Sequence, residues 1–190
     1  MLIGFHGYGE GADAQLARLQ AMPSAGDWTV VSIQALHRFY DRRANQVVAS
    51  WMTRQDRDLA IADNAAYVAA VIEEVMRERP SPYVVFAGFS QGVAMTFRAA
   101  AASARPVAGV IVAGGDVPPE IPPEALAKVG RALVCRGKED WAYASEKFDE
   151  DLRRLREAHV RVEQLEFAGG HEWSDEVVRA ADALLKELRQ

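Results

Sequence analysis

The sequence lacks the features that mark several classes of protein. It has a single cysteine, Cys135, so it cannot form an internal disulfide framework, and this scarcity is typical of a reducing compartment. No run approaches the roughly 20 apolar residues of a membrane helix. Residues 1–7 also lack the basic region and cleavage site of a signal peptide. We therefore expect a cytoplasmic protein without a membrane span.

Positive charge and cofactor-binding motifs are also scarce. Acidic residues outnumber basic ones by 27 to 22, the two kinds are interleaved, and no basic block occurs, so nucleic acid is not an expected partner. The 4 histidines are scattered, and neither of the common glycine-rich phosphate-binding motifs is present. We expect neither a metal ion nor another cofactor.

What is present is a globular composition, 49% hydrophobic and 26% charged, in a chain whose 190 residues predict one domain over residues 1–190. Apolar runs alternate with segments of helical periodicity. Six runs predict strands, at residues 2–6, 29–33, 83–87, 107–113, 132–136 and 160–167. This order predicts an α/β fold with a mainly parallel six-stranded sheet between two helical layers, a three-layer αβα sandwich.

The pentapeptide GFSQG, residues 88–92, stands between the apolar run 83–87 and an alanine-rich helical segment. Strand, G-x-S-x-G and helix in this order are the context of a nucleophile elbow, a sharp turn that holds its serine in strained backbone. Gly88 and Gly92 would let the strand and the helix approach closely without a Cβ clash. The helix N-terminus would then direct free N–H groups toward negative charge beside Ser90. For the pentapeptide alone, a chance turn is the alternative.

A serine nucleophile needs a base within hydrogen-bond reach, and that base needs an orienting carboxylate. Ligands of parallel sheets bind at the carboxyl ends of the strands, so the loops after the strands are the place to search. His171 lies in the loop after the last predicted strand and is the predicted base. His6 follows the first strand, where we expect it to shape a turn, and His37 and His159 have no catalytic context.

Two aspartates are candidates for the carboxylate. Asp140 follows the fifth predicted strand and Asp116 follows the fourth, and either gives the chain order serine, acid, histidine. We favour Asp140, because Gly137 allows a tight turn ahead of it, whereas a proline-rich segment follows Asp116.

An ester hydrolysed by a serine passes through an oxyanion, which needs preorganised N–H donors. The residue after the nucleophile, Gln91, supplies one backbone N–H in the predicted elbow. The other is expected from the loop after the first strand, where Tyr8 stands between Gly7 and Gly9. A merely flexible turn is the alternative for that loop.

These motifs form a recognisable set: His6-Gly7-Tyr8-Gly9, Ser50-Trp51, residues 88–95, Gly115-Asp116-Val117-Pro118, Gly137-x-x-Asp140 and Gly170-His171. In their order and spacing the chain resembles the α/β-hydrolase superfamily, and within it the phospholipase/carboxylesterase family that includes the acyl-protein thioesterases. The resemblance implies a catalytic triad of Ser90, Asp140 and His171. It also implies an oxyanion hole made by the N–H groups of Tyr8 and Gln91.

The chain departs from that pattern in two places. The first two strands of the superfamily have no counterpart, because the strand before the oxyanion loop begins at residue 2. We expect a reduced α/β-hydrolase fold with residues 29–33 at one edge of the sheet, no lid domain, and a homodimer as one way to cover the exposed edge. Residues 34–57, predicted to be a long, partly structured loop, match the family only at Ser50-Trp51, so substrate preference stays open.

Together these expectations describe a serine hydrolase that cleaves carboxylic esters or thioesters through an acyl-enzyme on Ser90. The candidates for lining its pocket, each of which is otherwise a packing residue, are Trp51, Val117, Trp141 and Trp173. So few apolar groups indicate a small open cleft, and hence small-molecule esters with short acyl chains.

Three alternatives remain. A lactonase similar to dienelactone hydrolases is less favoured, because those enzymes typically have cysteine at the elbow. A peptidase would use the same triad, although no carboxylate pair for binding an amine is evident. A non-catalytic small-molecule-binding protein on the hydrolase fold would keep the pocket without turnover.

Overall fold

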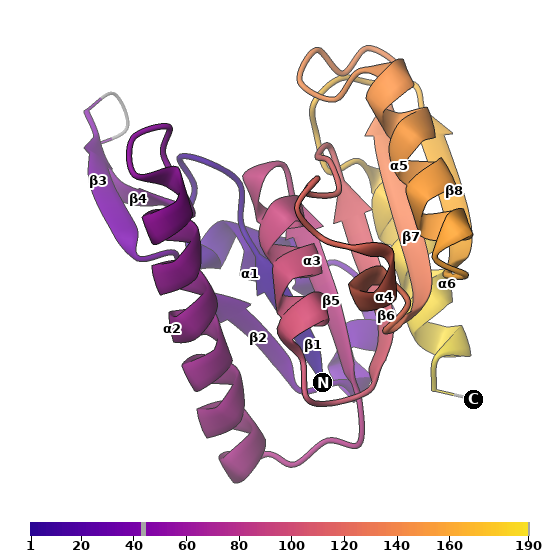
Figure 1. Ribbon diagram of the computed structural model, residues 1–190, viewed down its shortest axis with the longest axis horizontal. Coiled ribbons are helices and arrows are strands. Elements are labelled where there is room, and N and C mark those ends of the chain that lie inside the picture. The colour runs from indigo at the N-terminus through magenta and orange to yellow at the C-terminus, as the bar shows by residue number, and fades with distance from the viewer. Residues whose placement is uncertain (43–44, 190) are drawn as a thin grey trace.

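Six strands form one sheet in the computed structural model, which describes residues 1–42 and 45–189. Their spatial order is β2-β1-β5-β6-β7-β8, and every neighbouring pair is parallel. Their bounds are β1 (Leu2–Phe5), β2 (Val30–Ile33), β5 (Val84–Phe89), β6 (Val107–Ala113), β7 (Val129–Gly137) and β8 (Arg161–Phe167). The predicted parallel six-stranded sheet is confirmed, with β2 at one edge as expected and β8 at the other (Figure 1).

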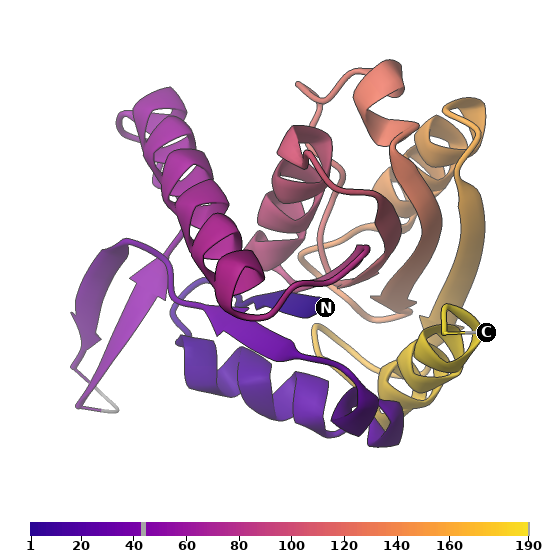
Figure 2. The ribbon, with the colours of Figure 1, turned by 90° about the horizontal axis from the view of Figure 1, so that it is seen from below.

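Helices cover both faces of the sheet (Figure 2). One face carries α2 (Arg57–Glu78), α3 (Gln91–Ala102), the short α4 (Pro123–Leu126) and α5 (Ser145–Glu157). The other carries α1 (Ala12–Gln20), the 3₁₀ turn Pro23–Asp27 and α6 (Asp175–Glu187). This is the predicted three-layer αβα sandwich.

The central strands read as unbroken apolar runs because each contributes to two hydrophobic cores. Along β5, Val84 and Phe86 belong to the core under α2, α3 and α5, whereas Val85 and Ala87 belong to the core over α1 and α6. Burial on both faces favours β-branched and aromatic residues at every position rather than at alternate ones. Cys135 in β7 is fully buried, as its position in an apolar run suggests.

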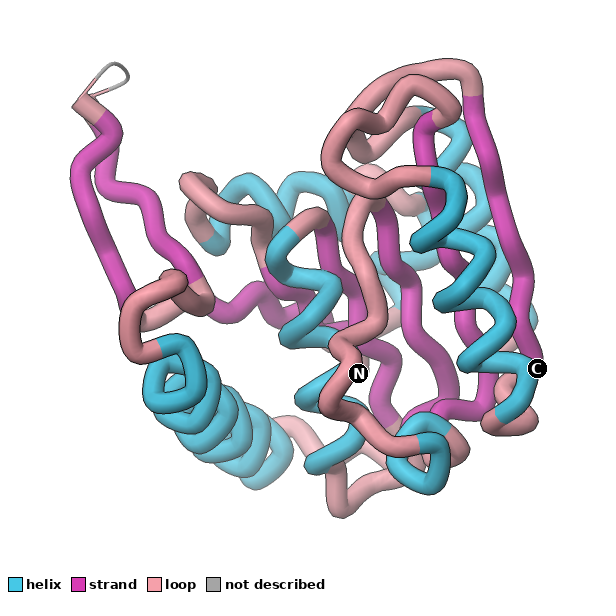
Figure 3. Tube along the Cα trace, turned by 45° about the horizontal axis from the view of Figure 1, so that its top comes forward, coloured by secondary structure: helices cyan, strands magenta, loops and turns pink. Residues whose placement is uncertain are grey.

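Residues 34–57 contain a β-hairpin that the sequence did not predict. Strand β3 (His37–Asp41) pairs antiparallel with β4 (Gln46–Ser50), and the pair stands away from the main sheet (Figure 3). The hairpin was missed because no strict alternation of apolar and polar residues marks it: β3 is largely exposed, whereas the last three residues of β4 are all buried. An antiparallel bridge between Glu10 and Ala49 joins its base to the loop after β1.

The turn between β5 and α3 has the tight geometry predicted for an elbow. Ser90 adopts φ 52° and ψ −120°, a conformation that costs a residue with a Cβ about 1–3 kcal/mol. A Cβ on Gly88 would lie 2.2 Å from Thr96 Oγ1, and one on Gly92 would lie 2.1 Å from the carbonyl oxygen of Phe5. The two glycines therefore allow β5, α3 and the end of β1 to come together around Ser90.

Within residues 1–42 and 45–189, none of the helices has both the length and the apolar composition needed to cross a membrane. Homodimer formation through the β2 edge stays a prediction.

We predict that Gly92→Ala lowers the free energy of unfolding by about 3 kcal/mol, because the added methyl group collides with backbone atoms that cannot move independently. Urea unfolding followed by circular dichroism measures the change.

Gly26→Ala is the matched control. A Cβ at Gly26 meets nothing within 4 Å, and the residue is exposed. Its stability should stay within about 0.5 kcal/mol of the parent protein. Equal stabilities for the two variants would contradict the close packing of α3 on β1.

Candidate active site

Three loops at the carboxyl ends of the strands bring together the predicted polar residues (Figure 1). Ser90 directly follows β5, Asp140 comes three residues after the end of β7, and His171 comes four residues after the end of β8. The parallel register places the carboxyl ends of these strands on the same side of the molecule. Ser90 and Asp140, 50 positions apart in the sequence, and Asp140 and His171, 31 positions apart, therefore become neighbours.

The three side chains form a continuous hydrogen-bonded chain. His171 Nε2 lies 2.8 Å from Ser90 Oγ, and His171 Nδ1 lies 3.0 Å from each carboxylate oxygen of Asp140. Because the carboxylate only accepts, Nδ1 carries the proton and Nε2 is free to accept from the serine hydroxyl. The imidazole is therefore held in the tautomer that a general base for Ser90 requires.

Asp140, not Asp116, is the carboxylate next to His171. Asp140 is 5% exposed, and its Oδ1 also accepts from the backbone N–H groups of Ala142 (2.8 Å) and Tyr143 (3.0 Å). Asp116 is exposed and makes no hydrogen bond to His171. Gly114, at φ 68°, leaves room for the pair, since a Cβ there would lie 3.0 Å from His171 Cε1.

A network of buried side chains that no sequence pattern indicated holds the loop of Asp140. The Tyr143 hydroxyl donates to Asp151 Oδ2 (2.9 Å), and Arg136 Nε donates to the carbonyl oxygen of Tyr143 (2.9 Å). Burial raises the pKa of Asp151, against the opposing effect of the N–H of Val117, which donates to the same carboxylate. The turn that carries Asp140 is thus fastened from both sides.

The two N–H groups predicted to bind an oxyanion are available. Gln91 is the first residue of α3, so its N–H has no acceptor within the helix. The N–H of Tyr8 has no acceptor in the part of the chain that the structure describes.

The side chain of Gln91 has a second contact set that the sequence did not reveal. Its Oε1 accepts from the N–H of Trp51 (2.8 Å), and its Nε2 donates to the carbonyl oxygen of Met52 (3.0 Å). Ser50 Oγ lies 3.2 Å from both amide atoms. Gln91 therefore links the elbow to the segment that leaves the hairpin.

A salt bridge holds the loop that contains Tyr8. Glu10 Oε2 accepts from the N–H of Gly7 (2.8 Å), while Arg18 donates to both carboxylate oxygens at 2.6 Å. Burial alone would raise the pKa of Glu10, but the hydrogen bonds and charge of Arg18 lower it overall, so the pair is ionised at neutral pH. The guanidinium also lies 4.3 Å from the centre of the Phe89 ring, next to Ser90.

His6 has the turn-shaping role expected of it. Its Nδ1–H donates to the carbonyl oxygen of Gly7 (2.8 Å), and its Nε2 accepts from the N–H of Ala35 (3.1 Å). Burial lowers the pKa of His6, which keeps the ring neutral and preserves both bonds. The indole N–H of Trp51 donates to the carbonyl oxygen of His6 (2.8 Å), so the buried indole ring packs against the start of the loop after β1.

The structure corrects two of the four predicted pocket residues. Trp51 is 0% and Val117 1% exposed, so both are core residues and neither can line an open cleft. Trp141 is 85% exposed, and its ring centre lies 5.7 Å from that of His171. Trp173 is half-buried against the core under α6. Sequence could not separate these cases, because each tryptophan lies in a loop whose direction is set by tertiary contacts.

An open cleft of about 400 Å³ lies beside Tyr8 and Gln91. Both of these residues line it, together with Met52, Thr53, Arg54 and Arg57. The last four were not identified from the sequence, because they lie where the hairpin leads into α2, and the hairpin was not predicted.

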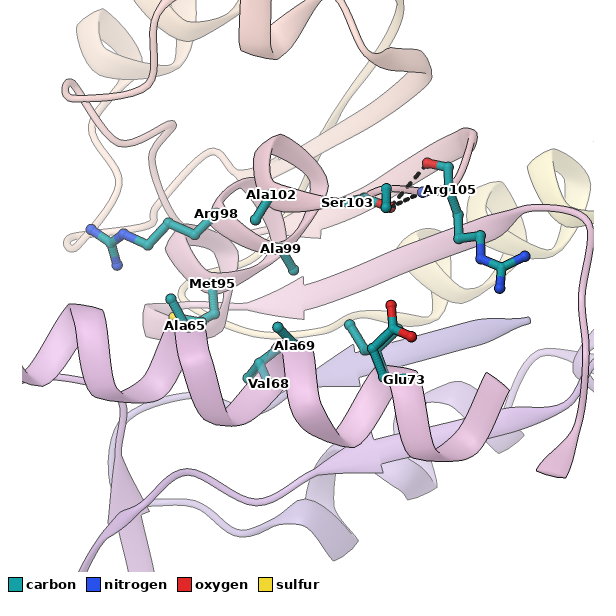
Figure 4. Close-up of a pocket in the computed structure, with 12 residues that line it drawn as sticks. Ala65, Val68, Ala69, Glu73, Met95, Arg98, Ala99, Ala102, Ser103 and Arg105 are labelled. Atoms are coloured by element: carbon teal, nitrogen blue, oxygen red, sulfur yellow. Dashed lines mark hydrogen bonds between the residues drawn. The ribbon is translucent and has the colours of Figure 1, made fainter. Parts of the chain in front are cut away.

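A smaller cavity of about 80 Å³ lies between α2 and α3, and it shares no residue with this cleft (Figure 4). Small apolar side chains such as Ala65, Ala69 and Ala99 form most of its wall, and the side chains of Glu73 and Arg105 extend at one end. None of the residues predicted to be catalytic borders it.

Over the described residues, no group of three or more histidine, cysteine, aspartate or glutamate side chains is placed to hold a metal ion.

Comparison with known proteins agrees with this architecture. The crystal structure of SOBER1 from Arabidopsis thaliana has a TM-score of 0.78 at 20% identity, with 100% of this chain and 98% of that chain covered. A carboxylesterase from Mesorhizobium loti gives 0.79 at 18% identity, covering 97% and 87% of the two chains. Acyl-protein thioesterase 2 from Zea mays gives 0.71 at 17% identity, covering 100% and 93%.

At these identities the three structures establish the fold. A search of curated protein sequences found no match. The profile of the Phospholipase/Carboxylesterase family matches residues 1–188. Since that match spans nearly the whole sequence, the chain belongs to the phospholipase/carboxylesterase family of hydrolases.

Proposed function

We propose that the protein hydrolyses carboxylic esters or thioesters of small molecules through an acyl-enzyme on Ser90. The observation that carries the proposal is the 2.8 Å contact between Ser90 Oγ and His171 Nε2, with Asp140 behind the ring. Family membership supports an esterase-type reaction, and the geometry supports these three residues as its catalytic groups.

In the acylation step, Ser90 Oγ attacks the carbonyl carbon while His171 Nε2 takes the hydroxyl proton. Negative charge then develops on the carbonyl oxygen. The N–H groups of Tyr8 and Gln91 stabilise it, and the N-terminus of the 12-residue helix α3 adds a favourable dipole. The imidazolium, held by its hydrogen bond to Asp140, returns its proton to the departing alcohol or thiol.

In the deacylation step, water takes the position of the alcohol. His171 removes a proton from the water, the hydroxide attacks the acyl carbonyl, and the collapsing intermediate releases the carboxylic acid as Ser90 recovers its proton. The cleft is open rather than a deep tunnel, which favours short acyl chains and small soluble esters.

We predict that Ser90→Ala reduces kcat for p-nitrophenyl acetate by about 10⁴-fold or more, because the nucleophile is lost while the fold is kept. Release of p-nitrophenolate measures the rate. A fluorophosphonate probe should label the parent protein at one site per chain, identified as Ser90 by peptide mass spectrometry.

Ser145→Ala is the matched control, since Ser145 is an exposed serine at the start of α5. It should keep full activity and full labelling. Hydrolysis that persists in Ser90→Ala would overturn the assignment of the nucleophile. A folded parent protein that neither reacts with the probe nor hydrolyses any ester would instead indicate a binding protein.

A second prediction concerns the salt bridge between Glu10 and Arg18. Arg18→Met should lower kcat about tenfold with little change in KM. Without the salt bridge the N–H of Tyr8 is no longer held in position, and that N–H contributes mainly when charge develops on the substrate oxygen. Steady-state kinetics with p-nitrophenyl acetate separates the two constants.

Arg153→Met removes an exposed ion pair with Glu157 on α5 and should leave both constants unchanged. The salt bridge does not position the oxyanion loop if Arg18→Met raises KM alone. The same conclusion holds if the variant lowers only the stability measured in urea and leaves kcat unchanged.

A further inference from the structure

We infer that the preferred substrate carries an anionic group, a carboxylate or a phosphate, which Arg54 and Arg57 bind in the cleft beside Ser90. The inference rests on the proposed function and concerns the class of ester rather than the reaction. It starts from the composition of the cleft wall. Of the six residues that line the cleft two are arginines and none is acidic, although acidic residues outnumber basic ones in the whole chain.

The cleft and the proposed oxyanion site share two residues. Tyr8 and Gln91, whose N–H groups would bind the carbonyl oxygen, are themselves part of its wall. A substrate whose carbonyl oxygen lies between those N–H groups therefore has one end in the cleft. An anionic group at that end meets Arg54 and Arg57 without leaving the site.

The two guanidinium groups have no carboxylate oxygen closer than 3.7 Å in the described residues, unlike those of several other arginines. Arg18, Arg98 and Arg136 each have a carboxylate oxygen within 2.7 Å. Arg57 reaches carboxylates only at 3.7 Å (Asp58) and 4.0 Å (Glu120), with a side chain that is 41% exposed.

Across residues 1–42 and 45–189, Arg54 forms no salt bridge. A guanidinium presents a planar fork of donors that matches carboxylate and phosphate oxygens. The two arginines can therefore bind a ligand anion without breaking a strong internal pair.

The segment that carries Arg54 is attached to the catalytic elbow. The Gln91 side chain bonds to the N–H of Trp51 and the carbonyl oxygen of Met52, three and two residues before Arg54. The Thr53 hydroxyl donates to the carbonyl oxygen of Gln55 (2.7 Å), which closes the turn around Arg54. The position of the anion site relative to the Gln91 N–H is thus set by hydrogen bonds, so it selects among substrates and does more than attract anions.

The experiment compares esters that differ in charge and are similar in size. The acyl arm sets mono-p-nitrophenyl glutarate against p-nitrophenyl pentanoate, and the alcohol arm sets 2-acetoxyethyl phosphate against 2-methoxyethyl acetate. In at least one arm the anionic ester should have a kcat/KM about tenfold higher than its neutral partner, mainly through KM. That advantage should shrink as salt rises from 20 to about 500 mM, because exposed charges are screened. The arm that responds identifies the side of the ester and the kind of anion.

Arg54→Gln and Arg57→Gln test the two side chains. Each should reduce the anionic-to-neutral ratio of kcat/KM by about threefold to fivefold, and the double variant should bring it close to one. Arg77→Gln is the matched control, because Arg77 lies on the same helix as Arg57 and pairs with Glu74 at the far end. It should leave the ratio unchanged.

The outcomes separate this inference from the proposed function. If no ester in the panel is hydrolysed, or hydrolysis survives Ser90→Ala, the proposed function fails. If hydrolysis depends on Ser90 but the neutral esters react as well as the anionic ones in both arms, the anion site alone is overturned. Equal loss of rate for both members of a pair in Arg54→Gln and Arg57→Gln also overturns it, since that result indicates a general disturbance of the site.

Discussion

Between β5 and α3 the chain reverses at Ser90, whose φ of 52° is held only because three segments meet there without side chains in the way. Glycines occupy the closest approaches: Gly92 faces the end of β1, and Gly115 faces the carbonyl oxygen of Ser90, 2.4 Å from where its Cβ would be. A conformation that costs about 1–3 kcal/mol persists when surrounding packing determines it. The turn therefore depends on the whole central sheet, and the position of the Ser90 hydroxyl is a consequence of β1, β5 and β6 lying side by side.

Around this turn, hydrogen bonds from polar side chains hold each loop in place. The Glu10–Arg18 pair holds the loop of Tyr8, the Gln91 amide holds the exit of the hairpin, and Asp151 with Tyr143 holds the loop of Asp140. Loops carry few backbone hydrogen bonds of their own, so their precision has to come from such side chains. The proposed catalytic groups thus have fixed positions before any substrate binds, which is the condition under which electrostatic stabilisation of a transition state is effective.

The sequence predicted what local patterns determine. Apolar runs located all six strands of the sheet, and the glycines of residues 88–92 indicated a close turn, because each signal is contained within a few neighbouring residues. The position of Asp140 next to His171 followed from strand order and tight-turn chemistry. The hairpin of β3 and β4 was missed because β3 is largely exposed and the buried residues of β4 are consecutive, so burial left no alternation of apolar and polar residues in the sequence. Trp51 was misplaced for a related reason: the bond from its indole N–H to His6 spans 45 residues, and no local pattern records it.

Charge in this protein acts on two length scales. The net charge of −5 would repel anions at a distance, but at physiological salt the Debye length is about 8 Å, so distant carboxylates are largely screened. An anionic group bound in the cleft as proposed would lie only a few ångströms from Arg54 and Arg57. At that distance the attraction between two opposite unit charges is about 1 kcal/mol or more even at the dielectric constant of water. Local charge therefore outweighs net charge for a ligand that has entered. On the proposed function, the elbow provides the reacting serine, and the segment between the hairpin and α2, which carries Arg54, is where we propose that the choice of ester is decided.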